Sequence, residues 1–514
     1  MAAAPVRLAE LLAALSAVSD AARGRPVDDA TRSCLVATGL ARRLGLAPPA
    51  VADVYYTTLL RSVGCTATSH ELAGLAGGDD VSIRGRGDMT DMSQPREAAA
   101  FIGGFGRGLP PGRRVRTVAG AAARGKQVAV QGFRADCEVA TAIARRLRLP
   151  AAVGQALLDV FERWDGKGGY RGAAGDEIAA PARYAAVGLC AAMFADEAEG
   201  AAAAVRRWRG RALDPVIADA FLTSSQELLA DAAVDDPWLA VVAAEPEPQR
   251  TATPDGIDAL ARAFADAVDL KAPCLQGHSA GVAGLATRAA ELAGWPEQDV
   301  TDLRRAALLH DIGRAGIATG VWEKPGPLST AEWEQVRLHA YHSERILTRA
   351  PTLAGLARTA GMHHERTDSS GYHRGVSGAM VEPAARFLAA ADAYHAMTEP
   401  RPHRPALTAA AAAATLQRMP LDHAAVEAVL EAAGHPPPGR RRWPAALTDR
   451  EVEVLRLLAA GRSKREIAAR LVLSASTVHT HTVHIYAKAA VSTRAALAMW
   501  AMEHDLVTPG EKID

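Results

Sequence analysis

Histidine is concentrated in one part of this 514-residue chain. Residues 1–277 contain one histidine, His70, whereas residues 278–403 contain nine. Seven polar groups of the second segment fall on or at the ends of helices that the apolar spacing predicts, namely His278, His310, Asp311, His339, His363, His364 and Asp392. Neutral imidazoles and carboxylates suit divalent iron, manganese, nickel or zinc. Seven groups exceed the needs of one ion, so they predict two ions, with Asp311 as a bridging carboxylate beside a water or hydroxide.

An earlier segment repeats the apolar pattern around these groups without the polar residues themselves. LLRSVG (59–64) matches LLHDIG (308–313) at an offset of 249, and ERWDGKGGYRG (162–172) matches ERTDSSGYHRG (365–375) at an offset of 203. The intervening loops differ in length, which loops tolerate. By these offsets the candidate ligands correspond to Asp29, Arg61, Ser62, Val160, Phe161 and Leu189. Scattered helix histidines would not disappear together, so we expect the first copy to be a scaffold and the second to hold the working site.

The composition favours helices as the elements that position these groups. Alanine is abundant and aromatic residues make up 5% of the chain, a balance that predicts an all-α fold. Apolar residues (49%) and charged residues (23%) are in globular proportion. The Gly- and Asp-rich stretch 74–95 and the segment GGFGRGLPPGRR (103–114) are typical of loops. VAAEPEPQRTATPDG (242–256) and GHPPPGRRRWP (434–444) predict two linkers.

Charge and cysteine content limit the class of protein. The formal net charge is zero, so any nucleic-acid binding must be local. The five cysteines show no paired spacing, which fits a reducing compartment. The first residues lack a signal-peptide pattern, and no run of 18 apolar residues occurs. We therefore expect a cytoplasmic protein that does not enter a membrane.

The second copy resembles an HD-GYP domain, a subgroup of the HD phosphohydrolases, over residues 255–430. The resemblance rests on GHSAGVA, LLHDIGRAGI, KPGPLSTAEWEQVRLHA, HHERTDSSGYHRG and ADAYHAMTEPRPHR. It implies an all-helical site in which the seven groups above bind two divalent metals, iron or manganese, and activate a hydroxide that attacks cyclic di-GMP or a related phosphoester. Asp311 and Arg314 would then be catalytic.

The same resemblance implies a substrate-binding set, which comprises Arg314, Tyr372, Arg401 and Arg404. Arg314 stands where the family has lysine, which keeps a positive charge in a planar form. Two departures concern the substrate and the metal number. His373 replaces the proline of the GYP loop, and Cys274 stands where members with a third metal carry glutamate. We therefore expect two metals rather than three.

The last seventy residues divide into four short helices. Thr448 with Glu451, and Ser463 with Glu466, have the spacing of capping boxes, and Gly461 follows the first helix as a C-terminal glycine does. SKREIAARL, a turn and SASTVHTHTVHIYAKA predict a helix-turn-helix. From residue 440 onward, 12 Lys/Arg face 8 Asp/Glu, so this part is locally basic.

This segment resembles the LuxR-type DNA-binding domain along its full length. The resemblance implies binding to double-stranded DNA as a homodimer, since such domains read paired half-sites. Expected DNA contacts are Lys464, Ser476, Thr477, His479, Thr480, His481 and Lys488, and the basic GRRR (439–442) before the domain could add backbone contacts. Lys464 and His479 depart from the usual Asn and Lys. The alternative is a helical bundle that contacts protein.

Together these features predict two tandem helical HD-type domains followed by a four-helix LuxR-type domain. The expected boundaries are 1–241 for a degenerate HD copy, 255–430 for the HD-GYP-like copy, 431–444 for a Pro/Arg-rich linker and 445–514 for the DNA-binding domain. The expected function is a DNA-binding regulator whose metal domain hydrolyses or senses a cyclic dinucleotide. One alternative is an inactive nucleotide or metal sensor, and a more distant one is a di-iron oxygenase.

Overall fold

The protein is a helical chain that folds as two compact units, residues 1–433 and 434–514. The computed structural model describes residues 6–197, 199–376, 378–435, 443–471, 473–504 and 506–507. Over these residues the predicted all-α class is confirmed. Their one sheet pairs β1 (Val6–Arg7) with β2 (Thr251–Ala252) antiparallel, with Val6 opposite Ala252. No helix in this part of the chain is long and apolar enough to cross a bilayer.

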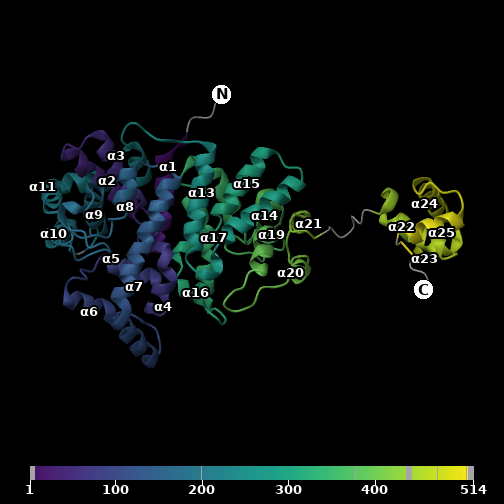
Figure 1. The fold of residues 1–514 in the computed structure, drawn as a ribbon, viewed down its shortest axis with the longest axis horizontal. Helices are drawn as coiled ribbons and strands as arrows, with labels where there is room; N and C mark the ends of the chain where they lie inside the picture. Colours follow the sequence, from purple (N-terminus) through teal and green to yellow (C-terminus); the bar gives the residue numbers. More distant parts are fainter. Residues whose placement is uncertain are drawn as a thin grey trace. The chain divides into compact units, whose positions relative to one another are not determined.

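The first unit consists of two copies of one helical arrangement, drawn in purple to blue and in teal to green in Figure 1. The first copy contains α1 (Leu8–Ala22), α2 (Asp29–Arg43), α3 (Pro48–Leu60), η1 (Cys65–Thr68), α4 (Ser69–Ala76), α5 (Asp80–Asp88), α6 (Pro95–Gly103), α7 (Pro111–Arg146), α8 (Ala151–Leu157), η2 (Gly175–Glu177), α9 (Ala180–Met193), α10 (Ala201–Trp208), α11 (Pro215–Ala232) and α12 (Pro237–Ala243).

The second copy repeats this order with a shorter middle. It contains α13 (Pro254–Asp269), η3 (Pro273–Leu275), α14 (His278–Leu292), α15 (Glu297–Leu309), η4 (Ile312–Gly316), α16 (Thr319–Trp322), α17 (Thr330–Leu347), α18 (Pro351–Gly361), η5 (Gly378–Met380), α19 (Pro383–Thr398), α20 (Ala409–Leu416) and α21 (His423–Ala432). Helices α2 and α14 both have 15 residues and start 249 positions apart, as the sequence offset predicts.

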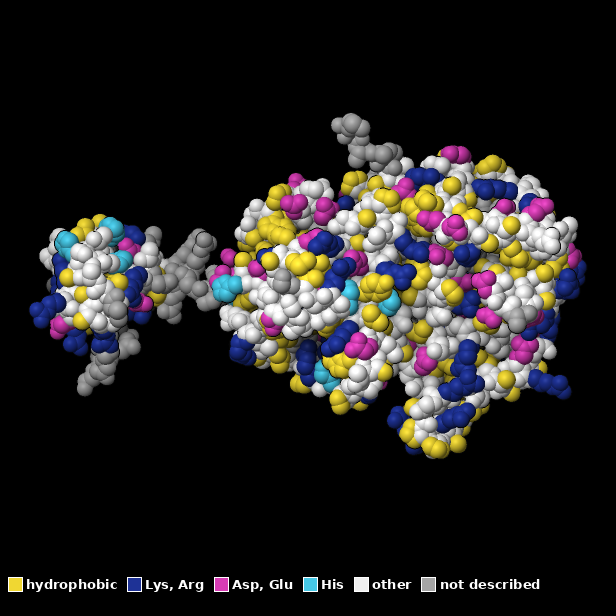
Figure 2. Space-filling model, turned by 180° about the vertical axis from the view of Figure 1, so that it is seen from behind, with side chains coloured by type: hydrophobic (Ala, Val, Ile, Leu, Met, Phe, Trp, Pro, Cys, Tyr) yellow, Lys and Arg dark blue, Asp and Glu magenta, His cyan; other side chains and the backbone are white. Residues whose placement is uncertain are grey.

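The offset falls from 249 to 203, so the first copy holds 46 more residues between its two anchors. The additional residues form α4 to α6 and the first half of α7; α4 and α5 pack against α16, whereas α6 and the start of α7 extend away from the rest of the unit. Lys and Arg side chains line this extension in Figure 2. The prediction of loops here was partly wrong, because α5 lies within 74–95. The Asp79 carboxylate starts α5 by accepting a hydrogen bond from the Ser82 N–H at 3.0 Å.

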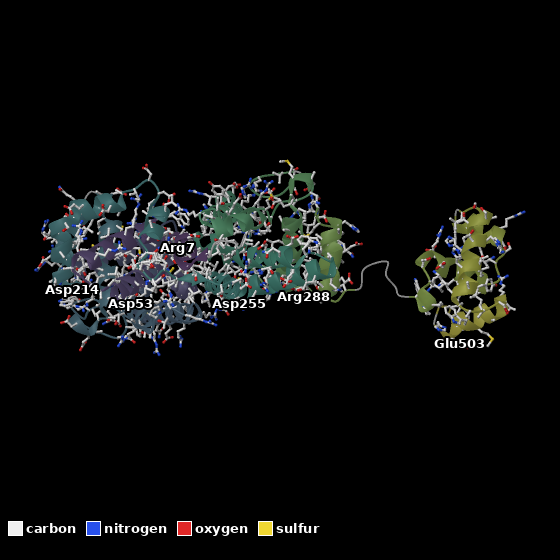
Figure 3. The ribbon with its side chains drawn as sticks, turned by 90° about the horizontal axis from the view of Figure 1, so that it is seen from above. Arg7, Asp53, Asp214, Asp255, Arg288 and Glu503 are labelled. Atoms are coloured by element: carbon white, nitrogen blue, oxygen red, sulfur yellow. The ribbon has the colours of Figure 1, made fainter. Side chains whose placement is uncertain are left out.

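The two copies share one apolar core. Side chains of α1, α3, α13, α14, α15, α18 and α19 belong to a single buried cluster. In Figure 3, Asp53 and Asp214 mark the first copy and Asp255 and Arg288 the second. Helix α1 packs closely on η4. A Cβ atom added at Gly316 would lie 3.3 Å from the Ala21 Cβ. The first copy therefore supports the loop that follows His310 and Asp311.

A buried polar junction also joins the copies. The Asp80 carboxylate accepts from the Lys271 ammonium at 3.0 Å and from the Thr319 N–H at 2.6 Å, and both charged side chains are fully buried. A buried ion pair is costly unless its remaining hydrogen bonds are made, and here the Thr319 amide contributes one. The junction fixes α16 against the first copy.

The second unit is a small helical domain with its own apolar core. It contains η6 (Pro444–Ala446), α22 (Asp449–Ala459), α23 (Lys464–Leu471), α24 (Ala475–Lys488) and α25 (Arg494–Glu503). The capping pairs Thr448–Glu451 and Ser463–Glu466 form as predicted. Residues 436–442, which include GRRR and most of the predicted linker, lie outside the described residues.

Candidate functional site

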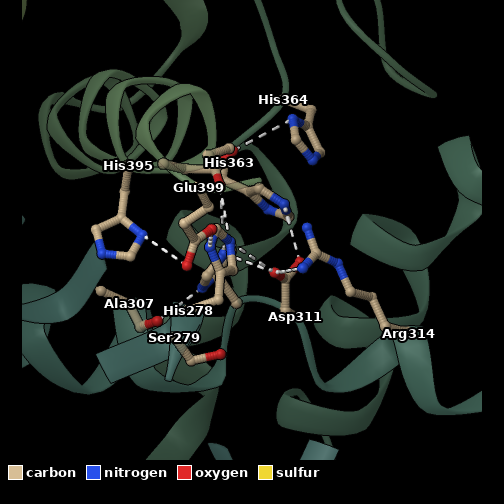
Figure 4. A network of polar contacts seen from close by, with 12 residues as sticks. His278, Ser279, Ala307, Asp311, Arg314, His363, His364, His395 and Glu399 are labelled. Carbon is tan, nitrogen blue, oxygen red and sulfur yellow. Dashed lines mark hydrogen bonds and ion pairs between the residues drawn. The ribbon is translucent and has the colours of Figure 1, made fainter. Parts of the chain in front are cut away.

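The structure brings all seven candidate ligands into one cluster inside the second copy (Figure 4). His278 is the first residue of α14, His310 and Asp311 directly follow α15, and the others come from α17, the end of α18 and α19. His364 is partly exposed and the other six are buried. Residues 114 positions apart in sequence, such as His278 and Asp392, thus lie 3.1 Å apart.

Asp311 stands between two groups of histidines. Its Oδ2 atom lies 3.0 Å from His310 Nε2 and 3.5 Å from His278 Nε2. Its Oδ1 atom lies 3.2 Å from His339 Nε2 and 3.5 Å from His363 Nε2. One carboxylate that presents each oxygen to a different pair of imidazoles has the geometry of a bridge between two cations.

Backbone carbonyls fix the tautomer of three of these histidines. The Nδ1 atoms of His310, His339 and His363 face the carbonyls of Ala307, Val336 and Ala360. A carbonyl can only accept, so each Nδ1 carries a proton and each Nε2 is left to face the cluster. This is the usual outer support of a metal-binding imidazole.

The protonation states of Asp311, Asp392 and His363 suit cation binding. Although burial opposes ionisation, Arg314 and His310 hold the pKa of Asp311 well below its usual value. Burial opposes ionisation of Asp392 as well, and the hydrogen bond from His278 holds its pKa well below the usual value. Burial lowers the pKa of His363 to about 4, so its imidazole is neutral near pH 7. The cluster therefore combines ionised carboxylates with a neutral imidazole.

Two further residues, which the sequence did not single out, border the cluster. The Glu399 carboxylate lies 2.9 Å from His278 Nδ1 and 3.3 Å from His395 Nδ1. Burial opposes charge on His278, yet its hydrogen bonds to Asp392 and Glu399 raise its pKa to about 9. Glu399 lies in the quoted stretch ADAYHAMTEPRPHR, four residues after His395, and directly follows α19.

Arg314 approaches the cluster from η4. Its Nη1 atom lies 2.6 Å from Asp311 Oδ2, and its guanidinium lies over the Trp322 ring at 5.1 Å from the centroid. The Trp322 ring also meets the edge of His339 at 5.9 Å. Trp322 is the last residue of α16, so the junction at Asp80 and Thr319 supports the side chain that holds Arg314.

The other predicted substrate contacts divide into two groups. Tyr372 lies against His364 with ring centroids 4.2 Å apart, and Arg401 donates to the Glu399 carboxylate at 2.7 Å. Both therefore border the cluster. Arg404 instead donates to backbone carbonyls at the end of α19, including that of Met397 at 3.2 Å. His373, which replaces the family proline, lies beside Tyr341 at 5.7 Å.

The equivalent region of the first copy keeps the frame and replaces the ligands. The Cβ that a side chain at Gly64 would add lies 2.0 Å from the Asp136 carbonyl, and at Gly313 it lies 2.1 Å from the His339 carbonyl, so both close approaches require glycine. Asp136 thus occupies the position of His339, a correspondence that the sequence offsets had left out. Its carboxylate is held by Arg84 at 3.3 Å rather than by a cluster of histidines.

In the second unit, the predicted DNA contacts lie mostly on one exposed face. Ser476, Thr477, His479 and Thr480 are exposed on α24, whereas His481 is half-buried. The Lys464 ammonium, from α23, donates to His479 Nδ1 at 2.8 Å, which brings the two helices of the motif together. Lys488 pairs with Glu451 at 2.7 Å at the far end of α24.

Comparison with known families agrees with both parts of this description. The model of the HD domain matches residues 262–424, and that of bacterial regulatory proteins of the luxR family matches residues 445–501. The chain carries an HD domain and a LuxR-type domain. HD domains are metal-dependent, and the imidazole and carboxylate clusters lie within the matched range.

Curated relatives belong to the HD-GYP phosphodiesterases. A 3′3′-cGAMP-specific phosphodiesterase 3 of Vibrio cholerae is 29% identical over 405 residues, which are 78% of this chain and 88% of the relative. A cyclic di-GMP phosphodiesterase of Thermotoga maritima is 40% identical over 129 residues, 25% of this chain and 35% of the relative. The first alignment is longer than residues 255–514 together, so it extends into the first copy.

A solved structure shares the fold. The crystal structure of a cyclic GMP-AMP specific phosphodiesterase of V. cholerae matches with a TM-score of 0.59 at 24% identity. The match covers 84% of this chain and 98% of that one. The two-copy helical arrangement therefore occurs in another protein.

Proposed function

We propose that the second copy hydrolyses a 3′,3′-cyclic dinucleotide and that the nucleotide state of this site biases DNA binding by the LuxR-type domain. The observation that carries the proposal is the Asp311 carboxylate with two imidazoles at each oxygen. The homology to HD-GYP phosphodiesterases gives the reaction class. Cyclic GMP-AMP and cyclic di-GMP are the substrates to test, since relatives are named for each.

The cluster fits two divalent ions, for which we propose iron or manganese. His278, His310 and Asp392 would hold one ion and His339, His363 and His364 the other, with Asp311 shared between them. Two ions there would lower the pKa of a water molecule and polarise a phosphoryl oxygen. The carbonyl contacts described above keep the Nε2 atoms of three of these histidines in the ligating form.

The surrounding side chains would orient the phosphodiester. Arg314 borders the cluster from η4, and Arg401 borders it from the segment after α19. Guanidinium groups bind phosphate oxygens well. Tyr372 offers an aromatic face beside His364 for a base or ribose. Arg404 donates to backbone carbonyls, so we propose that it stabilises the loop that carries Arg401. A direct contact between Arg404 and the substrate stays a prediction. Attack of water on phosphorus would release the 3′ ribose oxygen as a hydroxyl and open the ring.

We further propose that the second unit binds DNA as a homodimer. The exposed residues of α24 and the adjacent Lys464 are where a recognition helix contacts bases and backbone. Replacing Thr477 and His479 by alanine should abolish sequence-specific binding in a mobility-shift assay, while nucleotide binding stays unchanged. Equal DNA affinity in this variant would place the interface elsewhere.

The test of the central activity is turnover by anaerobically purified protein with both cyclic dinucleotides. We expect a linear dinucleotide to accumulate with the wild-type chain and none with Asp311→Ala. Binding without turnover would instead support the second candidate function, a catalytically inactive nucleotide sensor. Two observations favour that second candidate, namely the replacement of the GYP proline by His373 and the fusion to a LuxR-type domain.

A further inference from the structure

Arg61 is a charged side chain, and two of its buried nitrogen atoms have no hydrogen-bond partner in the described part of the chain. It follows α3 in the first copy, at the position that His310 occupies in the second. Its Nε and Nη1 atoms are buried and form no hydrogen bond within the described residues. Burying a charged group without hydrogen bonds costs several kcal/mol, so such a group normally has a partner.

The neighbouring groups do not supply that partner. The Asp88 carboxylate accepts from Arg23 at 2.7 Å, and Arg23 also donates to the Ser62 hydroxyl at 3.1 Å. Burial, followed by the charge of Arg23, lowers the pKa of Arg61 to about 10, so its guanidinium remains charged near pH 7. Arg23 also feels the charges of Asp29 and Asp20, whereas Asp88 is the carboxylate that acts on Arg61.

An aromatic ring forms one wall beside Arg61. The guanidinium carbon lies 5.7 Å from the centroid of Phe161, the residue at the position of His364. Phe161 stacks in turn on Phe133 with centroids 4.7 Å apart. Arg61 as a whole residue is only partly buried, although its Nε and Nη1 atoms are buried.

The two copies differ in charge at three equivalent positions, although the first copy keeps carboxylates, Asp29 and Asp136, at the positions of His278 and His339. In the second copy, Asp311 and Asp392 supply negative charge for cations. In the first copy these positions hold Ser62 and Leu189, and a guanidinium replaces the imidazole of His310. The same helical frame therefore holds an imidazole of the ligand cluster in one copy and, at the equivalent position, a guanidinium without hydrogen bonds at Nε and Nη1 in the other.

We propose that the first copy binds a phosphoryl group at Arg61. Its free N–H groups would donate to phosphate oxygens, and Phe161 would provide an apolar wall for whatever the phosphate carries. Free phosphate and the phosphate of a nucleotide share this chemistry. The site is separate from the metal cluster, so it does not depend on turnover in the second copy.

The test measures binding of inorganic phosphate and of GMP by calorimetry to the full chain. The background carries Asp311→Ala, Arg314→Ala and Arg401→Ala, which removes the metal ions and the phosphate contacts proposed for the second copy. We expect one equivalent bound per chain, at least tenfold weaker binding after Arg61→Met, and intermediate affinity after Arg61→Lys. Tighter binding of GMP than of phosphate would identify a nucleotide as the ligand class, and equal binding would identify the phosphoryl group alone.

A stability measurement guards against misfolding of the variant. Methionine replaces a buried charge by an apolar chain of similar length, so Arg61→Met should keep or raise the thermal midpoint. Phosphate should raise the midpoint of the background chain and leave that of Arg61→Met unchanged. Equal phosphate affinity with and without Arg61, or no binding by either probe up to about 10 mM, would overturn the proposal.

Discussion

The two copies of the first unit solve the same folding problem with the same residues. The Asp20 carboxylate accepts from the Ala30 N–H, and Asp269, 249 positions later, accepts from the Ser279 N–H at 2.9 Å. In each glycine-rich loop a buried glutamate accepts backbone N–H groups, as Glu365 does from Arg374 at 3.1 Å. These contacts satisfy backbone groups that any copy of this fold must satisfy.

Apart from the additional helices of the first copy, the differences at the site fall on side chains that the chemistry requires. Val160 and Leu189 are buried apolar residues where the second copy has His363 and Asp392. Exchanging a ligand for an apolar side chain removes the cost of burying a polar group and costs the fold nothing. A duplicated domain can therefore lose its site and keep its shape, and the first copy then acts as a support for α16 and η4.

Moving one residue between the copies tests most strongly whether only the second copy carries out chemistry. His363→Val places the residue of the first copy in the second, and hydrolysis of the cyclic dinucleotide should fall by at least about 100-fold, since a candidate ligand is lost. Val160→Ala in the first copy is the matched control and should leave turnover within about twofold, although it removes core volume and lowers stability. Equal loss in both would show that the first copy also takes part in chemistry.

The junction between the copies tests the supporting role. Asp80→Ala leaves the Lys271 ammonium buried without its partner, which should lower the free energy of unfolding by about 3–5 kcal/mol in urea titrations. Asp79→Ala, which removes the N-cap of α5, should cost only about 1 kcal/mol. If both variants lose the same stability, the buried pair does not join the copies as described.

Loss of a phosphate contact should have a smaller effect. Arg401→Ala should reduce kcat/KM by about 10- to 100-fold, the loss expected for a charge-assisted hydrogen bond, while metal content stays unchanged. Arg358, which pairs with Glu382 on the surface, provides a control that should leave kcat/KM unchanged. Unaltered kinetics in Arg401→Ala would place the substrate elsewhere.

The smallest expected effect links the second copy to DNA. Nucleotide at the metal cluster should change DNA affinity by about 1–3 kcal/mol, and DNA must change nucleotide affinity by the same factor. Promoter titrations with and without nucleotide, using wild type and Asp311→Ala, measure this coupling. Four superimposable curves would mean that one chain carries two independent functions.

The sequence predicted the helices and the seven candidate ligands because both follow short-range rules. Apolar spacing marks the helices, and the His310–Asp311 doublet after an apolar helix indicates the site. Contacts between distant segments were not predictable in this way. Glu399 meets His278 across 121 positions, and Asp80 meets Lys271 across 191. Helix α5 was missed because its glycines predict a loop, whereas tertiary packing and the Asp79 cap favour the helix.

The most direct test of the account is metal analysis of wild type, Asp311→Ala and Ser62→Ala, each purified without oxygen. The two substitutions occupy equivalent positions in the two copies. We predict about two ions per chain in wild type and Ser62→Ala, and almost none in Asp311→Ala, with helical content preserved in all three. Metal retained in Asp311→Ala, or lost in Ser62→Ala, would contradict the claim that only the second copy holds the working site.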